Sequence, residues 1–314
     1  MSEISVLVPS HNHARFIERT LRSIFAQAVG IKKLLVIDDG STDGSPVVIE
    51  NILEDCPFES ELIVRENRGL CATLNEGLSK TDGEFFAYLG SDDLWLPSFL
   101  EDQVPLLQSR PNAVLAFCHA FVIDEDEMII DRTDNWADFV DGNMLPCLLR
   151  GEIFSSPGVV YRRSAVERYG WNENSRLEDY ELYLNLCGTG EFARNEKLLC
   201  AWRQHGSNTS DNFPEMLQEH IAAQDRVAGR LGIERTELDR IQSELKFKGV
   251  RDHLRGGYKK EAWRLFRENR SGRSVSETMK TYVRLMMPQP LFQWNRARKR
   301  RSAIARYGRL DMEK

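Results

Sequence analysis

The sequence predicts an α/β protein with a mostly parallel, Rossmann-like sheet flanked by helices, followed by a helical C-terminal region. Short apolar runs of strand length alternate with stretches of helical spacing in the first half of the chain. That alternation is typical of parallel sheets covered by helices on both faces. From about Pro214 onward the pattern is helical throughout. We therefore divide the chain into a sheet domain, residues 1–212, and a helical region, residues 213–314, that ends in a basic tail.

Four short apolar runs predict the parallel half of the sheet. They are too short for buried helices and rich in strand-forming residues, as expected of strands buried on both faces. Between them, apolar residues recur at helical spacing, for example Phe16, Ile17, Leu21, Ile24 and Phe25. The predicted strands are 4–10, 34–37, 61–64 and 85–89, and the predicted helices run through 14–25, 47–52 and 70–78.

The second half of the sheet domain is less regular. Residues 113–118 and 121–123 predict two strands, and the acidic run 124–127 predicts a hairpin loop rather than a binding site. Residues 157–161 predict another strand, and a helix is expected from Glu178 until the glycines that follow it. Breaks in the helical region are expected at Gly256-Gly257, at Gly272 and at the Pro288/Pro290 pair.

Composition is that of an ordinary water-soluble globular protein. Of the 314 residues, 41% are hydrophobic and 29% are charged, and no apolar run is long enough to cross a membrane. The first residues do not have the pattern of a secretory signal. The six cysteines show no paired spacing, so we expect neither disulfides nor a zinc site and predict a cytoplasmic protein.

The net charge of −6 conceals an uneven distribution. Residues 243–314 carry 20 Lys and Arg against 7 Asp and Glu, so the first 242 residues are strongly acidic. Within the tail, the apolar segment 285–294 precedes a basic cluster. Such a tail suits the anionic inner surface of a membrane. It could instead be a solvated helix face, or dock on the acidic body of the chain or of a partner subunit.

Two adjacent carboxylates, Asp92 and Asp93, follow the fourth predicted strand. In an open α/β sheet, ligands bind at the carboxyl ends of the strands. Adjacent carboxylates repel each other unless a cation lies near them, and a divalent ion that itself binds a diphosphate would satisfy this requirement. The alternative for Ser91-Asp92-Asp93 is a solvated turn.

Six motifs in the same order resemble family-2 glycosyltransferases with the GT-A fold, over roughly the first two-thirds of the chain. The resemblance implies that residues 1–212 are a catalytic domain for a nucleotide-diphospho-sugar, with a divalent metal, Mg²⁺ or Mn²⁺, and inversion at the anomeric carbon. In this match Ser91 holds the first position of the Asp-x-Asp signature. The motifs are Val6-Leu7-Val8-Pro9-Ser10-His11-Asn12, Val36-Ile37-Asp38-Asp39-Gly40-Ser41-Thr42-Asp43-Gly44, Asn67-Arg68-Gly69, Ser91-Asp92-Asp93, Glu178-Asp179 and Trp202-Arg203-Gln204-His205-Gly206-Ser207-Asn208.

The acidic pair and a histidine are the candidate metal site. We assign Asp93 as the metal ligand, with Asp92 beside it touching ribose or metal. His205 could complete the metal shell, hold the diphosphate when protonated, or simply be exposed. Trp95, next to the acidic pair, could stack on a sugar or lie in the core.

The remaining donor contacts come from the first two strands and the third predicted helix. By resemblance Asp39 reads the nucleobase edge, although an N-cap role is the alternative. A carboxylate accepts from an N–H such as the uracil imide, which slightly favours UDP or dTDP donors. Pro9 and Ser10 would line the same pocket through backbone groups. Arg68 could touch the base or the diphosphate, or lie exposed in its loop.

Asp179 is the predicted general base, which takes the proton from the attacking acceptor hydroxyl. The ordinary pKa of an aspartate is about 3.9. Burial would raise that pKa toward neutrality, whereas a helix N-terminus would lower it. The alternative is that Glu178-Asp179 only starts a helix, because acidic residues favour a first turn.

Together these features predict an inverting, metal-dependent glycosyltransferase. The acceptor would be the hydroxyl of a glycan or of a lipid-linked sugar, in bacterial surface polysaccharide synthesis. We expect no nucleic-acid partner. The alternatives are a sugar nucleotidyltransferase, which usually carries a Gly-rich basic loop near its N-terminus, and a non-catalytic carbohydrate-binding protein, which would be expected to lose Asp93 or Asp179.

Overall fold

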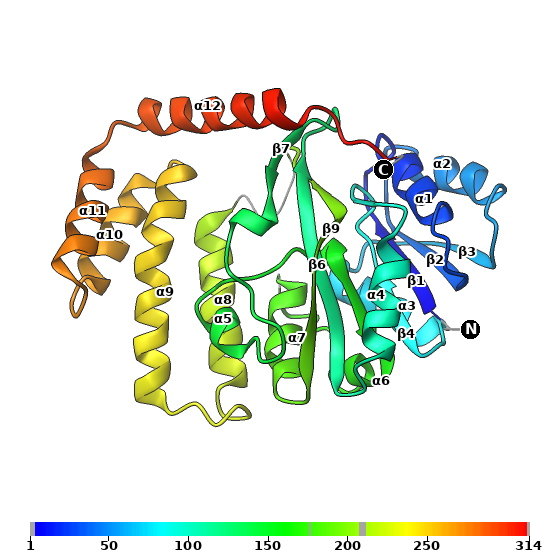
Figure 1. The fold of residues 1–314 in the computed structure, drawn as a ribbon, viewed down its shortest axis with the longest axis horizontal. Coiled ribbons are helices and arrows are strands. Elements are labelled where there is room, and N and C mark those ends of the chain that lie inside the picture. Colours follow the sequence, from blue (N-terminus) through cyan, green and yellow to red (C-terminus); the bar gives the residue numbers. More distant parts are fainter. Residues whose placement is uncertain (1–3, 176, 207–211, 313–314) are drawn as a thin grey trace.

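The computed structural model describes residues 4–175, 177–206 and 212–312, and Figure 1 shows how they are arranged. One mixed sheet runs in the order β3-β2-β1-β4-β8-β6-β9-β5, with β7 paired to β6. The strands are β1 (Ile4–Ser10), β2 (Ile31–Asp39), β3 (Ser60–Arg65), β4 (Phe85–Tyr88), β5 (Leu94–Trp95), β6 (Ala113–Ile123), β7 (Ile129–Arg132), β8 (Val159–Arg162) and β9 (Glu191–Arg203). The helices are α1 (Ile17–Phe25), α2 (Ser45–Leu53), α3 (Leu70–Lys80), α4 (Phe99–Gln108), α5 (Leu145–Leu149), α6 (Arg163–Glu167), α7 (Glu178–Cys187), α8 (Phe213–Val227), α9 (Arg235–Arg255), α10 (Lys259–Asn269), α11 (Val275–Met286) and α12 (Gln289–Tyr307), with 3-10 turns η1 (Thr133–Asn135) and η2 (Ser156–Gly158).

The first half of the sheet is parallel, as predicted. β1 pairs in parallel with β2 and β4, and β2 pairs in parallel with β3. Alternate residues of β2 enter two different cores, which explains its continuous apolar run. Leu34 and Val36 pack in the core that contains α1, α2 and α4, whereas Leu35 and Ile37 pack in the core that contains α3, α5 and α7.

The second half of the sheet mixes strand directions. β8 is antiparallel to both β4 and β6, while β9 is parallel to β6 and antiparallel to β5. The two strands predicted at 113–118 and 121–123 form one continuous strand, β6. The acidic run 124–127 does form the loop of a hairpin between β6 and β7. This hairpin extends the sheet domain toward the C-terminal helix (Figure 1).

Trp95 is a core residue, so its predicted alternative role of stacking on a sugar is wrong. The side chain is fully buried in β5. Its ring stacks on Phe99 with centroids 4.4 Å apart, and its indole N–H donates to the Pro157 carbonyl at 2.7 Å. Both faces of the ring are therefore unavailable to a ligand.

The C-terminal helices form a second packing unit. Val250, Leu254, Ala262, Leu265, Phe266 and Leu285 make a small separate core between α9, α10 and α11. The expected breaks at Gly256-Gly257, Gly272 and Pro288/Pro290 all separate helices. α8 differs from these helices, because its Ala223 and Val227 are buried in the core of the sheet domain. The predicted boundary at residue 212 thus assigns to the helical region a helix that also packs on the sheet domain.

The tail does not run free into solvent; it docks on the sheet domain. Arg300 Nη2 lies 2.7 Å from Asp124, and Arg309 Nη2 lies 3.2 Å from Glu127. Leu310 is buried against Leu94, Ile123, Ile129 and Ala201. In Figure 1, α12 crosses from the helical region back to the β6–β7 hairpin. The docking of basic residues on the acidic body was one of the alternatives that the sequence left open.

Leu310→Ala is expected to lower the free energy of unfolding by about 2 kcal/mol, because it removes buried apolar surface and leaves a cavity. The urea midpoint measures this change. The matched control is Val275→Ala, whose side chain is 83% exposed and which should leave the midpoint unchanged. An unchanged midpoint for Leu310→Ala would mean that the docked tail contributes no stability.

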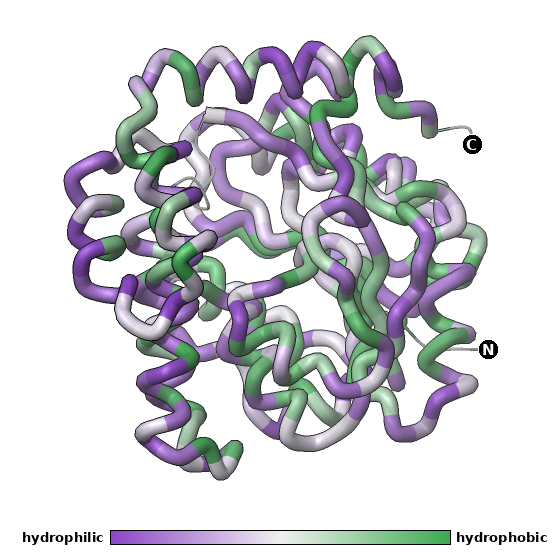
Figure 2. Tube along the Cα trace, turned by 60° about the vertical axis from the view of Figure 1, so that its left-hand side comes forward, coloured by the Kyte–Doolittle hydropathy of each residue, from purple (hydrophilic) through white to green (hydrophobic). Residues whose placement is uncertain are grey.

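Figure 2 shows the hydropathy of the fold, with apolar residues concentrated along the sheet and hydrophilic residues predominating in α12. Among the described residues, no helix has the length and apolar character needed to cross a membrane.

Candidate active site

The loops after β1 and β2 interlock at the carboxyl end of the sheet. Asn12, held at a φ of 55°, donates its backbone N–H to Ser41 Oγ at 2.8 Å and accepts from Thr42 N at 2.8 Å through its side chain. The Ser10 hydroxyl donates to Asp38 at 3.1 Å. Asp38 also accepts from the Ser41 backbone N–H, so Asp38 is the residue that organises this turn.

Asp39 is held at the end of β2 by the loop after β3. Its two carboxylate oxygens accept backbone N–H groups from Arg68 and Gly69, each at 2.8 Å. The Arg65 guanidinium donates to one of the same oxygens. The other oxygen accepts only the Gly69 N–H among the described residues, which leaves it room for one more donor. The Arg68 side chain is directed to Glu76, 3.3 Å away, and is largely exposed.

Pro9 and Ser10 end β1 and are both buried. They pair with Ile37 and Asp38 in the parallel register, which brings them beside Asp39. The predicted donor residues of the first two strands therefore meet at one edge. Their side chains are not open to a ligand, so any contact from them would use backbone groups.

The two adjacent aspartates after β4 have different surroundings. Asp93 is buried, and its carboxylate accepts the Arg203 backbone N–H at 2.8 Å. Burial and the neighbouring Asp92 charge raise the pKa of Asp93 well above its ordinary value. Asp92 instead directs a carboxylate oxygen to His205 Nε2, 2.8 Å away. The sequence assigned the metal to Asp93, but the carboxylate that faces His205 is Asp92.

Three side chains from three different segments form a cluster with metal-binding geometry. The ligand atoms of His13, Asp92 and His205 all lie within 4.8 Å of one another, and the three residues are partly buried. His13 Nδ1 lies 3.8 Å from Asp92 and 2.8 Å from the Ser91 hydroxyl. Burial lowers the pKa of His13, which keeps its imidazole neutral and able to bind a cation. The donor set fits a divalent ion that completes its shell with oxygens of a ligand.

Arg203 anchors the acidic loop, residues 91–93, through hydrogen bonds. Its guanidinium is almost fully buried; Nε donates to the Asp92 carbonyl at 2.7 Å, and Nη1 donates to the Asp124 carbonyl at 3.1 Å. Its Nη2 lies 3.5 Å from Glu127, which also pairs with Arg19. A buried arginine with several acceptors orients the loop rigidly, so Arg203 positions both aspartates.

Glu178 and Asp179 begin α7 and are half-buried. Burial raises the pKa of Asp179 to about 6, although the backbone N–H groups of the first turn oppose the shift. Burial and the Asp179 charge raise the pKa of Glu178 to about 8. Of the two opposing effects that the sequence left open, burial is the larger.

Several contacts tie the Asp179 segment to the donor edge of the sheet. The Cys71 thiol lies 3.5 Å from the Ser175 carbonyl, and Asn75 exchanges hydrogen bonds with the Trp171 backbone at 2.8 Å. Cys71 and Asn75 belong to α3, whose preceding Gly69 holds Asp39. Burial raises the pKa of Tyr88, at the end of β4, and the charges on Glu178 and Asp179 add to the shift. The segment before Asp179 thus packs on the helix whose N-terminal side holds Asp39.

A family model described as glycosyl transferase family 2 matches residues 5–170, just over half of the chain. The chain belongs to glycosyltransferase family 2. The matched segment spans β1 to β8 and contains Asp39 and Asp92. Asp179 and His205 lie beyond it.

Relatives in this family are distant. An uncharacterized glycosyltransferase of Nostoc sp. is 30% identical over 170 residues, 53% of this chain and 52% of its own length. Chondroitin synthase of Escherichia coli is 24% identical over 239 residues, 74% of this chain but 33% of its own length. The chain therefore spans only about half, or a third, of these family-2 proteins.

Solved structures confirm the predicted GT-A fold. A mannosyltransferase of Pyrobaculum calidifontis, solved with GDP-Man and Mn²⁺, has a TM-score of 0.62 at 18% identity, covering 96% of this chain and 86% of its own. Staphylococcus aureus TarS 1–349, solved with UDP-GlcNAc, has a TM-score of 0.61 at 15% identity, covering 98% and 92%. Both alignments include the helical C-terminal region, at identities that establish the fold alone.

Two residues of this family-2 site were missed in the sequence. His13 was given no role from the sequence, because nothing in its neighbours marks it as a ligand. Arg203 was named only within the last of the six motifs, because its burial and its contacts with the acidic loop are visible only in the structure. The usable signal was positional: the carboxyl ends of neighbouring parallel strands meet, so residues after β1 and β4 must come together.

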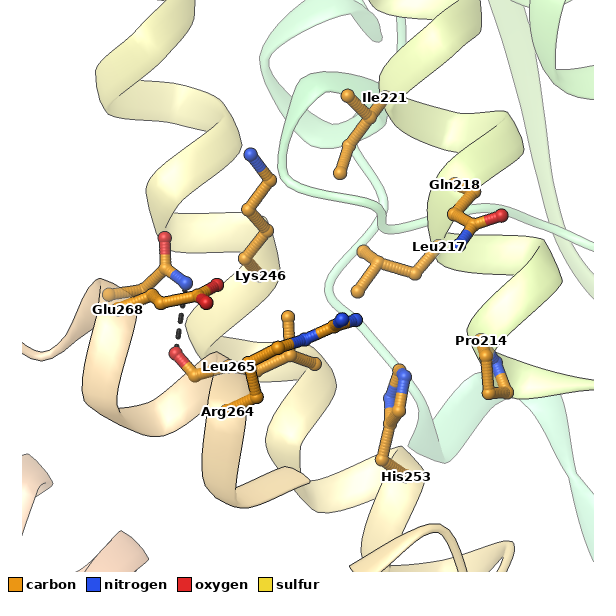
Figure 3. Close-up of a pocket in the computed structure, with 10 residues that line it drawn as sticks. Pro214, Leu217, Gln218, Ile221, Lys246, His253, Arg264, Leu265 and Glu268 are labelled. Atoms are coloured by element: carbon orange, nitrogen blue, oxygen red, sulfur yellow. Dashed lines mark hydrogen bonds between the residues drawn. The ribbon is translucent and has the colours of Figure 1, made fainter. Parts of the chain in front are cut away.

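A hollow of about 320 Å³ lies away from this constellation, between α8, α9 and α10 (Figure 3). It is lined by Leu217, His253, Arg264 and Leu265 among others, and by none of the predicted site residues. Asn269 donates to the Leu265 carbonyl at 2.9 Å within α10. This hollow belongs to the packing of the helical region.

Proposed function

We propose that this chain is an inverting glycosyltransferase that moves a sugar from a nucleotide-diphospho-sugar to a hydroxyl of a glycan or lipid-linked acceptor. UDP and dTDP donors are favoured, and bacterial surface polysaccharide synthesis is the setting. The observation that carries the proposal is the His13–Asp92–His205 cluster, at the strand edge that also carries Asp39. Asp179 supplies the group that such a reaction needs on the acceptor side.

His13, Asp92 and His205 are the proposed metal ligands. This revises the expectation from sequence, in which Asp93 and His205 held the ion, because the Asp93 carboxylate is buried against the Arg203 backbone. When bound, a divalent ion supplies positive charge that stabilises the departing nucleoside diphosphate. Two imidazoles are poor partners for Mg²⁺, which prefers oxygen ligands, so we favour Mn²⁺ over Mg²⁺. The Mn²⁺ bound to the mannosyltransferase neighbour is consistent with this choice.

Asp39 is the proposed nucleobase contact. Its carboxylate is almost buried, yet one oxygen keeps an acceptor position open. An imide N–H of uracil or thymine can donate to that position. Guanine also presents N–H donors, so the donor panel described below is what separates UDP or dTDP from GDP.

Asp179 is the proposed general base. At neutral pH its carboxylate is ionised, since the pKa of about 6 lies below 7 but well above that of a free aspartate. A base with a pKa near the working pH transfers a proton efficiently. It takes the acceptor's hydroxyl proton as that oxygen attacks the anomeric carbon from the face opposite the diphosphate.

Hydrolysis of nucleotide sugars tests the proposal without knowledge of the acceptor. We expect slow release of UDP or dTDP from one donor in a panel of UDP-, dTDP- and GDP-sugars, with Mn²⁺ giving a higher rate than Mg²⁺. A chelator should abolish the release, and Mn²⁺ should restore it. Hydrolysis that proceeds equally well in chelator would remove the metal from the mechanism, and release of GDP alone would overturn the assigned nucleobase.

The proposed location is the inner face of a membrane, where lipid-linked acceptors lie. The basic tail is one membrane contact that the sequence left open, and it supplies several arginines. Two of them are already engaged, since Arg300 and Arg309 pair with Asp124 and Glu127. The tail therefore retains only part of its charge for a membrane.

A further inference from the structure

α11 presents a largely exposed apolar stripe, of which only Tyr282 packs against aromatic rings of the described chain, Trp263 and Phe266 of α10. Val275, Met279, Tyr282, Val283 and Met286 are between 43% and 83% exposed. Their spacing of three and four residues places them on one side of the helix. The opposite side carries Leu285, which is fully buried in the small core with α9 and α10. The exposed stripe is thus a true outer surface and not a badly packed core.

A hollow of about 540 Å³ adjoins this stripe, between the end of α10 and the start of α11. Its apolar walls are Trp263, Phe266, Met279 and Tyr282, and three arginines line it as well. Those arginines are Arg267, Arg270 and Arg273. Arg273 contacts Glu244 at 3.4 Å, whereas Arg267 and Arg270 are exposed and form no ion pair with any described residue.

The charge around the stripe selects its partner. The segment that forms α10, α11 and the turn between them, residues 259–286, contains 8 Lys and Arg but only 3 Asp and Glu. On α11 itself, the exposed Lys280 lies toward one edge of the stripe. A second copy of the chain meeting this face symmetrically would place arginines against arginines, which opposes association. An apolar stripe bordered by cations instead complements acyl chains beneath anionic headgroups.

We propose that α11 and the adjoining arginine hollow form a docking surface for a membrane rich in anionic phospholipid. The stripe enters the boundary between headgroups and acyl chains, and Arg267 and Arg270 bind lipid phosphates. This inference rests on the proposed membrane-linked acceptor, but it moves the main contact from the tail helix to α11. It also explains why the exposed apolar residues of α11 lie next to Arg267 and Arg270.

Vesicle binding tests the surface. Full-length protein is incubated with phosphatidylcholine vesicles that contain or lack phosphatidylglycerol, and the bound fraction is measured by sedimentation at low and high salt. We expect binding only to the anionic vesicles, with release by salt. Met279→Asp with Val283→Asp should lower the partition coefficient at least tenfold, and Arg267→Glu with Arg270→Glu should do the same.

Matched variants separate the alternatives. Val47→Asp changes a residue of α2 that is 63% exposed and should leave binding unchanged. Lys299→Glu with Arg301→Glu reverses the same number of charges on α12 and should lower binding less than threefold. A larger loss from α12 than from α11 would return the contact to the tail, and unchanged binding in the α11 variants would overturn the proposal.

Two further readouts complete the experiment. Thermal melting should be unchanged in every variant, because each replaced side chain is exposed. Light scattering measures the oligomeric state. If the parent protein is a dimer that does not bind vesicles, and the α11 substitutions dissociate it, the stripe binds a second copy of the chain instead. Donor hydrolysis is measured on the same samples, so failure of the membrane contact and failure of the proposed activity give different results.

Discussion

Asp92→Asn is expected to abolish metal-dependent turnover while leaving the fold intact. The change replaces a charged oxygen ligand by a neutral amide of nearly the same shape. Outer-sphere partners of metal ligands already contribute about 10- to 100-fold in affinity, so loss of a direct carboxylate should weaken Mn²⁺ binding by about 100-fold or more. The affinity is measured by the electron paramagnetic resonance signal of free Mn²⁺, titrated with protein in the presence of UDP.

Asp93→Asn is the matched control, one residue away. The Asp93 carboxylate accepts a hydrogen bond from the Arg203 backbone N–H, and the side-chain amide oxygen of asparagine can accept the same hydrogen bond. Because burial raises the pKa of Asp93, the neutral amide also resembles the uncharged state that burial favours. We expect the Asp93→Asn protein to retain most of its Mn²⁺ affinity. The reverse result, with loss at Asp93 and retention at Asp92, would restore the metal assignment made from sequence.

The difference between these two residues marks the limit of what the sequence could predict here. The apolar run and the acidic pair predicted a cation site at the end of β4. This was possible because a strand buried on both faces is a continuous apolar run that can be recognised in the sequence. Which carboxylate turns outward depends on Arg203, 110 residues further on, whose backbone and guanidinium hold the loop. Contacts between residues so far apart in the chain leave no local sequence pattern. The sequence alone therefore could not show which of Asp92 and Asp93 faces outward.

The same reasoning separates the two halves of the sheet. Strands β1 to β4 were predictable because each run sends alternate side chains into two cores. The direction of β8 was not predictable, since a strand between two cores reads the same whether it runs parallel or antiparallel. Trp95 follows the acidic pair as a ligand-stacking residue could, but its place in β5 buries it completely. Burial was decided by the pairing of β5 with β9.

The tail illustrates a choice that the sequence posed without deciding. A basic helix can face solvent, a membrane or an acidic body. Asp124 and Glu127, in the loop of the β6–β7 hairpin, pair with Arg300 and Arg309. Glu127 also pairs with Arg203, and Arg203 donates to the Asp92 carbonyl. The docked tail is therefore linked through Glu127 to the residue that positions Asp92.

Asp179→Asn is expected to abolish transfer while leaving nucleotide binding intact. The base acts only on the acceptor hydroxyl, and its loss commonly costs about 10²–10⁴ in rate. Single-turnover transfer measures the rate, and UDP affinity is measured separately by calorimetry. Retention of the parent rate, or a parallel collapse of UDP affinity, would count against Asp179 as the base.

The pH profile and the neighbouring glutamate sharpen this test. Because burial raises the pKa of Asp179 to about 6, the base is protonated and inactive below that pH and ionised above it. The parent rate should therefore fall about tenfold per pH unit below 6, and this acidic limb should be absent from the residual activity of Asp179→Asn. Glu178→Gln is the control: the pKa of Glu178 is raised to about 8, so its side chain is mostly neutral at pH 7 and an amide replaces it closely. We expect that variant to keep most of the rate and the acidic limb, whereas loss of both at Glu178 would move the proton acceptor by one residue.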